Sequence, residues 1–152
     1  MKPAAIRAHI IANAAELARL HARIRETAFE CDASPICYAP WEEACAQLLL
    51  RADTLAFPGS YKAALETFRA GDESVVEPAL CFLEVRPYFH RSGYMFGVMM
   101  RRVRRAALSD SQRQRLDAVI TRNAAWKARK GRHHETCITP HLSCGLPSRQ
   151  SS

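Results

Sequence analysis

The sequence predicts an all-α fold, an irregular bundle of about six helices with a disordered C-terminal tail. Apolar residues recur at three- and four-residue steps through most of the chain, and no segment shows the period-two alternation of a half-buried strand. Helix-start signals precede several of the periodic segments. Apolar residues are 48% of the 152 residues and charged residues are 24%, as in ordinary globular proteins. We therefore expect one helical domain over residues 1–130 and a tail over residues 131–152.

The first periodic segment, residues 3–30, predicts one long helix with a single apolar stripe. Asn13 lies within this stripe, and we expect it to be an ordinary core amide with a hydrogen-bond partner. The remaining stripe positions are Ile6, Ile10, Leu17, Leu20, Ile24 and Ala28. Residues 31–40 contain two prolines and polar turn residues, so this segment is predicted to be a loop.

Two further helices are predicted before residue 72. The first covers residues 41–56, and four of its residues share one apolar face. That face consists of Trp41, Cys45, Leu48 and Leu49. The second begins after Ser60, whose hydroxyl can cap a helix, and ends at Gly71, since glycine is favoured just past a helix end. Its expected core residues are Tyr61, Leu65 and Phe68.

A fourth helix is predicted within residues 74–86. It begins either at Ser74, which has glutamate three residues later in a capping-box pattern, or at Pro78. It ends near Arg86, because Pro87 disfavours helical geometry in the residue before it. Its expected core residues are Leu80, Cys81 and Leu83.

The fifth helix is predicted at residues 93–107, with Ser92 as its N-cap. One face is apolar and consists of Phe96, Met99, Met100, Val103 and Ala107. The opposite side carries Tyr94, Arg101, Arg102, Arg104 and Arg105. The preceding turn contains Tyr88, Phe89 and His90, and we expect the two aromatic rings to close one end of the core.

The last helix begins with the capping box Ser109-Asp110-Ser111-Gln112 and continues to about Lys130. Its predicted apolar face consists of Leu116, Val119, Ile120, Asn123 and Trp126. Its basic residues, which we expect to lie on the surface, are Arg113, Arg115, Arg122, Arg129 and Lys130.

Charge is distributed unevenly along the chain. The net charge is +7, yet residues 1–76 hold eight Lys/Arg and ten Asp/Glu, whereas residues 77–152 hold fourteen and five. An electrostatic partner should therefore meet the C-terminal half. No signal peptide or membrane-spanning run is evident, so we expect a cytoplasmic protein that does not enter membranes. Its six cysteines are then thiols rather than disulfides.

The sequence offers no catalytic constellation, and we assign no catalytic residue, metal ligand or cofactor. Glu84, Tyr88 and His90 are close in sequence and could do acid–base work, but such a trio is common by chance. The tail holds four possible metal ligands, His133, Cys137, His141 and Cys144, whose spacing does not match a zinc knuckle. Whether they bind a metal stays open.

We predict a small non-enzymatic interaction or regulatory protein that binds another protein through the surface around residues 86–105. The residues expected to contact the partner are Tyr94, Arg101, Arg102, Arg104 and Arg105. The alternative is that these arginines bind nucleic acid, since guanidinium groups match phosphate oxygens and an aromatic ring can stack on a base. The sequence does not indicate the oligomeric state.

Overall fold

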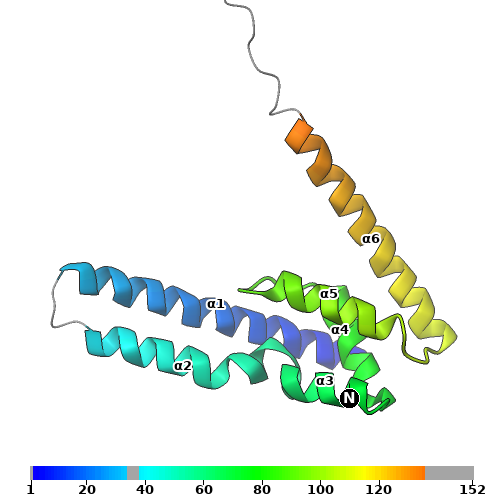
Figure 1. Ribbon diagram of the computed structural model, residues 1–152, viewed down its shortest axis with the longest axis horizontal. Helices are drawn as coiled ribbons and strands as arrows, with labels where there is room; N and C mark the ends of the chain where they lie inside the picture. Colours follow the sequence, from blue (N-terminus) through cyan, green and yellow to red (C-terminus); the bar gives the residue numbers. More distant parts are fainter. Residues whose placement is uncertain (1, 34–37, 136–152) are drawn as a thin grey trace, which may run out of the picture. The chain divides into compact units, whose positions relative to one another are not determined.

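The computed structural model describes the backbone of residues 2–33 and 38–135, and the side chains of residues 2–29 and 38–129. Most of the described residues are helical and none is in a strand, so the prediction of an all-α fold is confirmed (Figure 1). The elements are α1 (Pro3–Ala33), α2 (Tyr38–Ala56), α3 (Tyr61–Arg69), a 3-10 turn η2 (Glu73–Val75), α4 (Val76–Val85), α5 (Ser92–Val103) and α6 (Asp110–Glu135). The chain divides within α6 into two compact units, Met1–Val119 and Ile120–Ser152.

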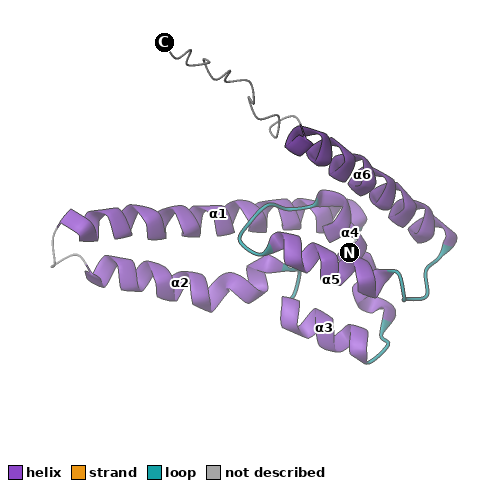
Figure 2. Ribbon diagram, turned by 45° about the horizontal axis from the view of Figure 1, so that its top comes forward, coloured by secondary structure: helices purple, strands orange, loops and turns teal. Residues whose placement is uncertain are grey.

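In the first unit, α1 and α2 form a long antiparallel hairpin (Figure 2). The helices α3, α4 and α5 gather at the end of the hairpin where α1 begins and α2 ends. The predicted stripe of α1 is buried from Ile6 to Leu20, and Asn13 within it lies 3.4 Å from the ring of His9. Toward the other end Ile24 is only half-buried, because fewer elements cover that end.

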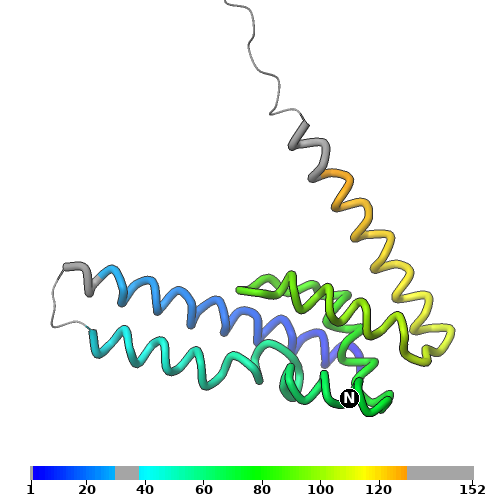
Figure 3. Tube along the Cα trace, viewed as in Figure 1, coloured from blue at the N-terminus to red at the C-terminus, as the bar shows by residue number. Residues whose placement is uncertain are grey.

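Two tight turns place α3 beside the hairpin, and the trace in Figure 3 follows the chain through them. Gly59 and Gly71 both have positive φ, which side chains with a Cβ rarely adopt. Ser60 caps α3 as predicted, because its hydroxyl accepts a hydrogen bond from the amide of Ala63 at 3.2 Å. Asp72 accepts one from the amide of Ser74 at 2.8 Å and begins η2. The chain therefore enters α4 through η2, and neither of the two predicted starts is correct.

The helix α4 is the centre of the core. Its predicted core residues Leu80, Cys81 and Leu83 are fully buried, and so is Phe82. The ring of Phe82 lies 5.7 Å from the ring of Phe57, between centroids, and so joins α4 to the end of α2. Burial of several large apolar side chains on one helix contributes on the order of 2 kcal/mol each.

The helix α5 differs from its prediction at both ends. Arg91 is the N-cap, in the left-handed region, and Ser92 is the first helical residue. The hydroxyl of Ser92 instead accepts a hydrogen bond from the amide of Phe89 at 3.2 Å and closes the preceding turn. The helix ends at Val103 rather than residue 107, because the amides of Arg105 and Ala106 bond to carbonyls three residues back rather than four. Repulsion between neighbouring arginines disfavours further helix.

The inward face of α5 is formed by Met95, Met99, Met100 and Val103. The predicted apolar face did not include Met95, which is buried, and it included Phe96. Phe96 is half-buried, and the guanidinium carbon of Arg86 lies 5.0 Å from its ring centroid, a cation–π contact.

The start of α6 is fixed as predicted by a capping box. The Ser109 amide donates to the Gln112 side chain at 3.1 Å, and the Gln112 amide donates to the Ser109 hydroxyl at 3.3 Å. Leu116 and Val119 are buried in the first unit. Arg115 does not lie on the basic surface. It forms ion pairs with Glu77 at 2.6 Å and Glu84 at 2.7 Å.

The second unit contains the remainder of α6, and its described side chains, residues 120–129, are exposed or half-buried. The predicted tail of residues 131–152 begins inside α6, whose backbone continues to Glu135. The rest of that tail lies outside the described residues, as do the side chains of His133, Cys137, His141 and Cys144.

Candidate partner-binding groove

The first unit contains a groove of about 650 Å³, which we call the central groove. It is lined by five segments: α1, α2, α3, the turn before α5, and α5 itself. The lining residues are Leu17, His21, Leu48, Leu49, Ala52, Asp53, Ala56, Tyr61, Lys62, Leu65, Phe89, His90, Arg91, Tyr94 and Met95. Most of them are apolar or aromatic, and the volume falls in the usual range for ligand sites.

Two large side chains along the central groove are strongly exposed. Leu49 on α2 is 79% exposed and Tyr94 on α5 is 64% exposed. Of the four residues that the sequence placed on one face of α2, Trp41 and Leu49 are exposed and the other two are half-buried. Within the first unit α2 packs mainly on α1, with fewer contacts to α3, so this face is only partly covered. Exposed apolar surface of this kind is typical of binding sites.

The central groove is cationic at its edges. Lys62 and Arg91 line it, and Asp53 is the one carboxylate among its described lining residues. That carboxylate accepts a hydrogen bond from the hydroxyl of Ser60 and another from the amide of Lys62 at 3.1 Å, which hold it at the start of α3. The described lining therefore carries two cationic side chains and one anionic side chain, with the cations in excess.

The wall between α3 and α5 holds a buried polar atom without a hydrogen-bond partner, the hydroxyl oxygen of Tyr61. Burial and the nearby Tyr94 raise the pKa of Tyr61, while Arg101, Arg91 and Arg102 act in the opposite direction. The three arginines of α5 and its cap thus lie near this wall. A buried hydroxyl without a hydrogen-bond partner typically costs about 1–3 kcal/mol of stability.

Two histidines meet at one side of the central groove. The rings of His21 on α1 and His90 in the preceding turn of α5 lie 5.8 Å apart, between centroids, in an edge-to-face arrangement. Burial lowers the pKa of His21, and the charges of His90 and Arg25 lower it further. Both imidazoles also line an adjoining hollow of about 580 Å³.

The structure separates the five residues predicted to contact a partner. Tyr94 lines the central groove, and Arg101 lies near its α3 wall. Arg102 and Arg105 line a different hollow, of about 230 Å³, which also contains the acidic residues Asp72 and Glu73. Arg104 is exposed in the turn after α5. The arginines therefore do not form one continuous helix face.

The turn before α5 is held between two non-glycine residues in the left-handed region, Arg86 with φ 50° and Arg91 with φ 68°. Pro87 takes the buried position of this turn, and Tyr88 points outward with 93% of its surface exposed. The prediction that Tyr88 closes the core is wrong, whereas Phe89 is half-buried and lines the central groove. Left-handed non-glycine residues cost about 1–3 kcal/mol each and tend to occur at functional sites.

Glu84 is one of the three residues considered for acid–base catalysis, and two arginines bind its carboxylate. Arg115 binds it through two hydrogen bonds and Arg7 through a third, at 2.9 Å. Hydrogen bonds from Arg115, opposed by burial, lower the pKa of Glu84. It stays ionised and bound, so it is a structural carboxylate.

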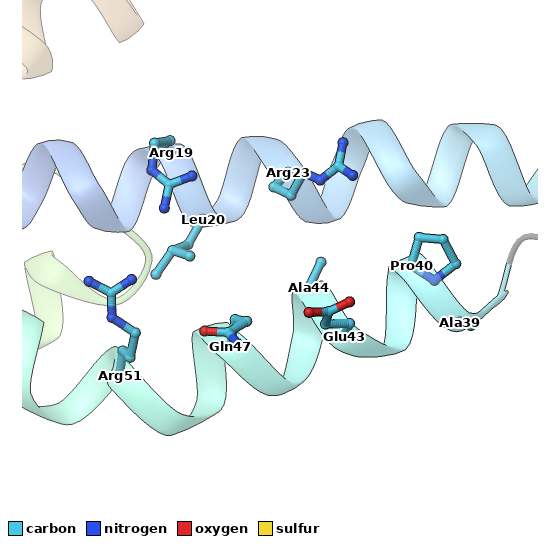
Figure 4. Close-up of a pocket in the computed structure, with 9 residues that line it drawn as sticks. All are labelled: Arg19, Leu20, Arg23, Ala39, Pro40, Glu43, Ala44, Gln47 and Arg51. Carbon is cyan, nitrogen blue, oxygen red and sulfur yellow. The ribbon is translucent and has the colours of Figure 1, made fainter.

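A second groove, of about 530 Å³, runs between α1 and α2 toward the far end of the hairpin. Figure 4 shows Arg19 and Arg23 on α1 opposite Glu43, Gln47 and Arg51 on α2. Its arginines are largely paired: Arg19 and Arg51 both bind Glu16, at 2.7 Å in each case. These pairs lower the pKa of Glu16 to about 2, with Arg19 the largest cause. This groove is better explained as a helix–helix interface.

Sequence reasoning missed the central groove because its residues come from five segments. The signal that could have pointed to it is the pair Leu48-Leu49 on a face that also carries Ala52 and Ala56, too small to fill a core.

The described side chains contain no group of three or more His, Cys, Asp or Glu placed to hold a metal. None of the described helices combines the length and apolar character needed to cross a bilayer. Comparison with family models, with curated proteins and with solved structures gave no match to this chain.

Proposed function

We propose that this protein acts in the cytoplasm as a non-enzymatic interaction or regulatory protein that binds another protein. The observation that supports the proposal is the central groove, an apolar hollow of about 650 Å³ with strongly exposed leucine and tyrosine side chains along it. It adjoins the surface of residues 86–105 through the turn before α5 and through Tyr94. Exposed apolar patches with a polar rim commonly mark protein-binding sites.

Two adjacent leucines of α2 provide a matched test. Leu49 and Leu50 are both 79% exposed, but Leu49 lines the central groove and Leu50 does not. Changing either to aspartate should leave the fold intact, because exposed substitutions usually change stability by about 0.5 kcal/mol or less. Only Leu49→Asp places a charge in the groove.

The experiment compares immobilised wild type, Leu49→Asp and Leu50→Asp in extract of the cells that make the protein, with quantitative mass spectrometry. We expect one protein to be retained in stoichiometric amount by the wild type and Leu50→Asp, and to be lost with Leu49→Asp. Circular dichroism of each variant controls for folding. Equal retention by all three forms, or recovery of nucleic acid alone, would contradict the proposal.

The second candidate function is nucleic-acid binding, and the observation in its favour is the exposure of Arg101, Arg104 and Arg105. It predicts an affinity that falls steeply with salt. The Arg101→Glu/Arg105→Glu variant should then lose binding to labelled DNA or RNA at physiological salt while keeping its helical circular dichroism. If binding occurs only at low salt, this candidate fails and the arginines are a solvated basic surface.

A further inference from the structure

We infer that the occupant of the central groove is an acidic amphipathic helix of a partner protein. This inference rests on the proposed protein-binding function and specifies the chemistry of the partner. Three features of the groove support it: its helical walls, the spacing of its apolar side chains and the charge at its edges.

The walls favour a helix over an extended segment. Among the described residues there is no strand, so the groove offers no sheet edge on which an extended peptide could add its backbone hydrogen bonds. Instead α1, α2 and α5 each present side chains to the same hollow. A helix satisfies its own backbone and needs only an apolar stripe to pack between other helices.

The apolar side chains set the length of the occupant. On α2 the lining runs from Leu48 to Ala56, which spans about 12 Å, or a little over two turns. Across from it, Tyr94 and Met95 line the groove from α5. A partner stripe at i, i+3 or i+4, and i+7 covers this length, and small residues at Ala52 and Ala56 leave room for its larger side chains.

The charges at the edges select an acidic partner. Lys62 and Arg91 line the groove, and Arg101 lies near the Tyr61 wall. The one lining carboxylate among the described residues, Asp53, is held by hydrogen bonds at the start of α3 and is outnumbered by the cations. Glutamate and aspartate beside the apolar stripe of the partner would therefore meet an excess of positive charge, whereas a basic helix would be less favoured.

The test is a displayed library of short helices that share one leucine stripe and vary every polar position among glutamate, lysine and glutamine. The library is selected on full-length wild-type protein, and binders are then measured on Leu49→Asp, Leu50→Asp and Tyr94→Ala. We expect glutamate-rich helices to be enriched, to bind Leu50→Asp as they bind the wild type, and to lose roughly tenfold or more in affinity with Leu49→Asp and with Tyr94→Ala. Their binding should also weaken as salt is raised.

Enrichment of lysine-rich or uncharged helices would overturn the inference, as would binders that do not depend on Leu49 or Tyr94. The outcome is separable from that of the proposed function. A native partner that is lost with Leu49→Asp but contacts the groove through a loop would leave the proposed function intact and overturn the acidic helix. Absence of any Leu49-dependent native partner would contradict the proposed function itself.

Discussion

Arg115 on α6 binds Glu84 on α4 through a bidentate ion pair. Its Nε lies 2.7 Å from Oε1 of the carboxylate, and its Nη2 lies 2.9 Å from Oε2. A third nitrogen of the same guanidinium donates to Glu77 at 2.6 Å, and Arg7 of α1 also donates to Oε2 of Glu84, at 2.9 Å. One arginine thus links the beginning of α6 to α4, and through Glu84 to α1. Planar, bidentate geometry of this kind is among the stronger polar interactions in proteins.

Replacing Arg115 by methionine should lower the free energy of unfolding by about 2–3 kcal/mol, because it leaves two largely buried carboxylates without their shared partner. Less than a third of each of the three side chains is exposed, so solvent screens this network only in part. Urea denaturation followed by circular dichroism measures the change. Arg113→Met, two residues away and exposed, is the control and should stay within about 0.5 kcal/mol of the wild type. Equal losses for both variants would contradict a special role for Arg115.

Acid should destabilise the protein as these carboxylates gain protons. Hydrogen bonds from Arg115 and Arg7 lower the pKa of Glu84 against the effect of burial. The pKa of Glu77 is also lowered, since Arg115 and Gln112 outweigh its burial. A lowered folded-state pKa gives stability that is complete above the unfolded-state pKa, about 4.5, and is lost as the pH falls toward the folded-state value. We expect the urea midpoint to drop below pH 4.5, and to drop less in the Arg115→Met variant. If the urea midpoint falls by the same amount below pH 4.5 in both proteins, this network is not the source of the loss of stability.

His21 should add a second, milder loss of stability at higher pH. Burial, His90 and Arg25 lower its pKa below the unfolded value of about 6.5, so the unfolded chain binds its proton more readily. The resulting stability is complete above pH 6.5 and declines as the pH falls through that value toward the folded-state pKa. The urea midpoint of the wild type should therefore decrease between about pH 6.5 and pH 5, and His21→Gln should remove part of this slope. The exposed His9 is the matched control, and a slope that survives His21→Gln but disappears with His9→Gln would contradict the assignment.

Tyr61→Phe should stabilise the free protein by about 1 kcal/mol, because it removes a buried hydroxyl that has no hydrogen-bond partner. The ring itself still packs in the wall of the central groove. Thermal unfolding gives the difference, and Tyr94→Phe is the control, since the Tyr94 side chain is mostly exposed. A loss of stability in Tyr61→Phe would show that the hydroxyl is hydrogen-bonded in solution.

The parts of the fold that depend on local chemistry could be predicted from the sequence. The hydroxyl of Ser60 and the Ser109/Gln112 pair each act within three residues, and the structure places both as expected. The long stripe of α1 is likewise a property of one segment. The start of α4 was missed because Asp72 forms the cap that the sequence pattern assigned to Ser74.

The parts that depend on distant segments could not be predicted. Whether Leu49 is buried depends on which element covers α2, and helical spacing alone does not tell an uncovered apolar face from a core face. The pairing of Arg115 with Glu84 joins residues 31 positions apart, so the arginine resembled any other basic surface residue. The end of α5 at Val103 separated four arginines that helical spacing had placed on one face.

The separation in sequence of the contacts around α1 has a consequence for the order in which the molecule folds. Its contacts with α2 close a short connection, whereas Arg7 meets Glu84 across 77 residues. Closing the longer loop costs more chain entropy, so we expect the hairpin to be formed in the transition state and the ion-paired end of the unit to close after it. In stopped-flow measurements Ala44→Gly, at the buried hairpin position of α2, should mainly slow folding, and Arg115→Met should mainly speed unfolding. If instead Arg115→Met mainly slows folding and Ala44→Gly mainly speeds unfolding, α4 and the start of α6 pack onto α1 before the hairpin forms.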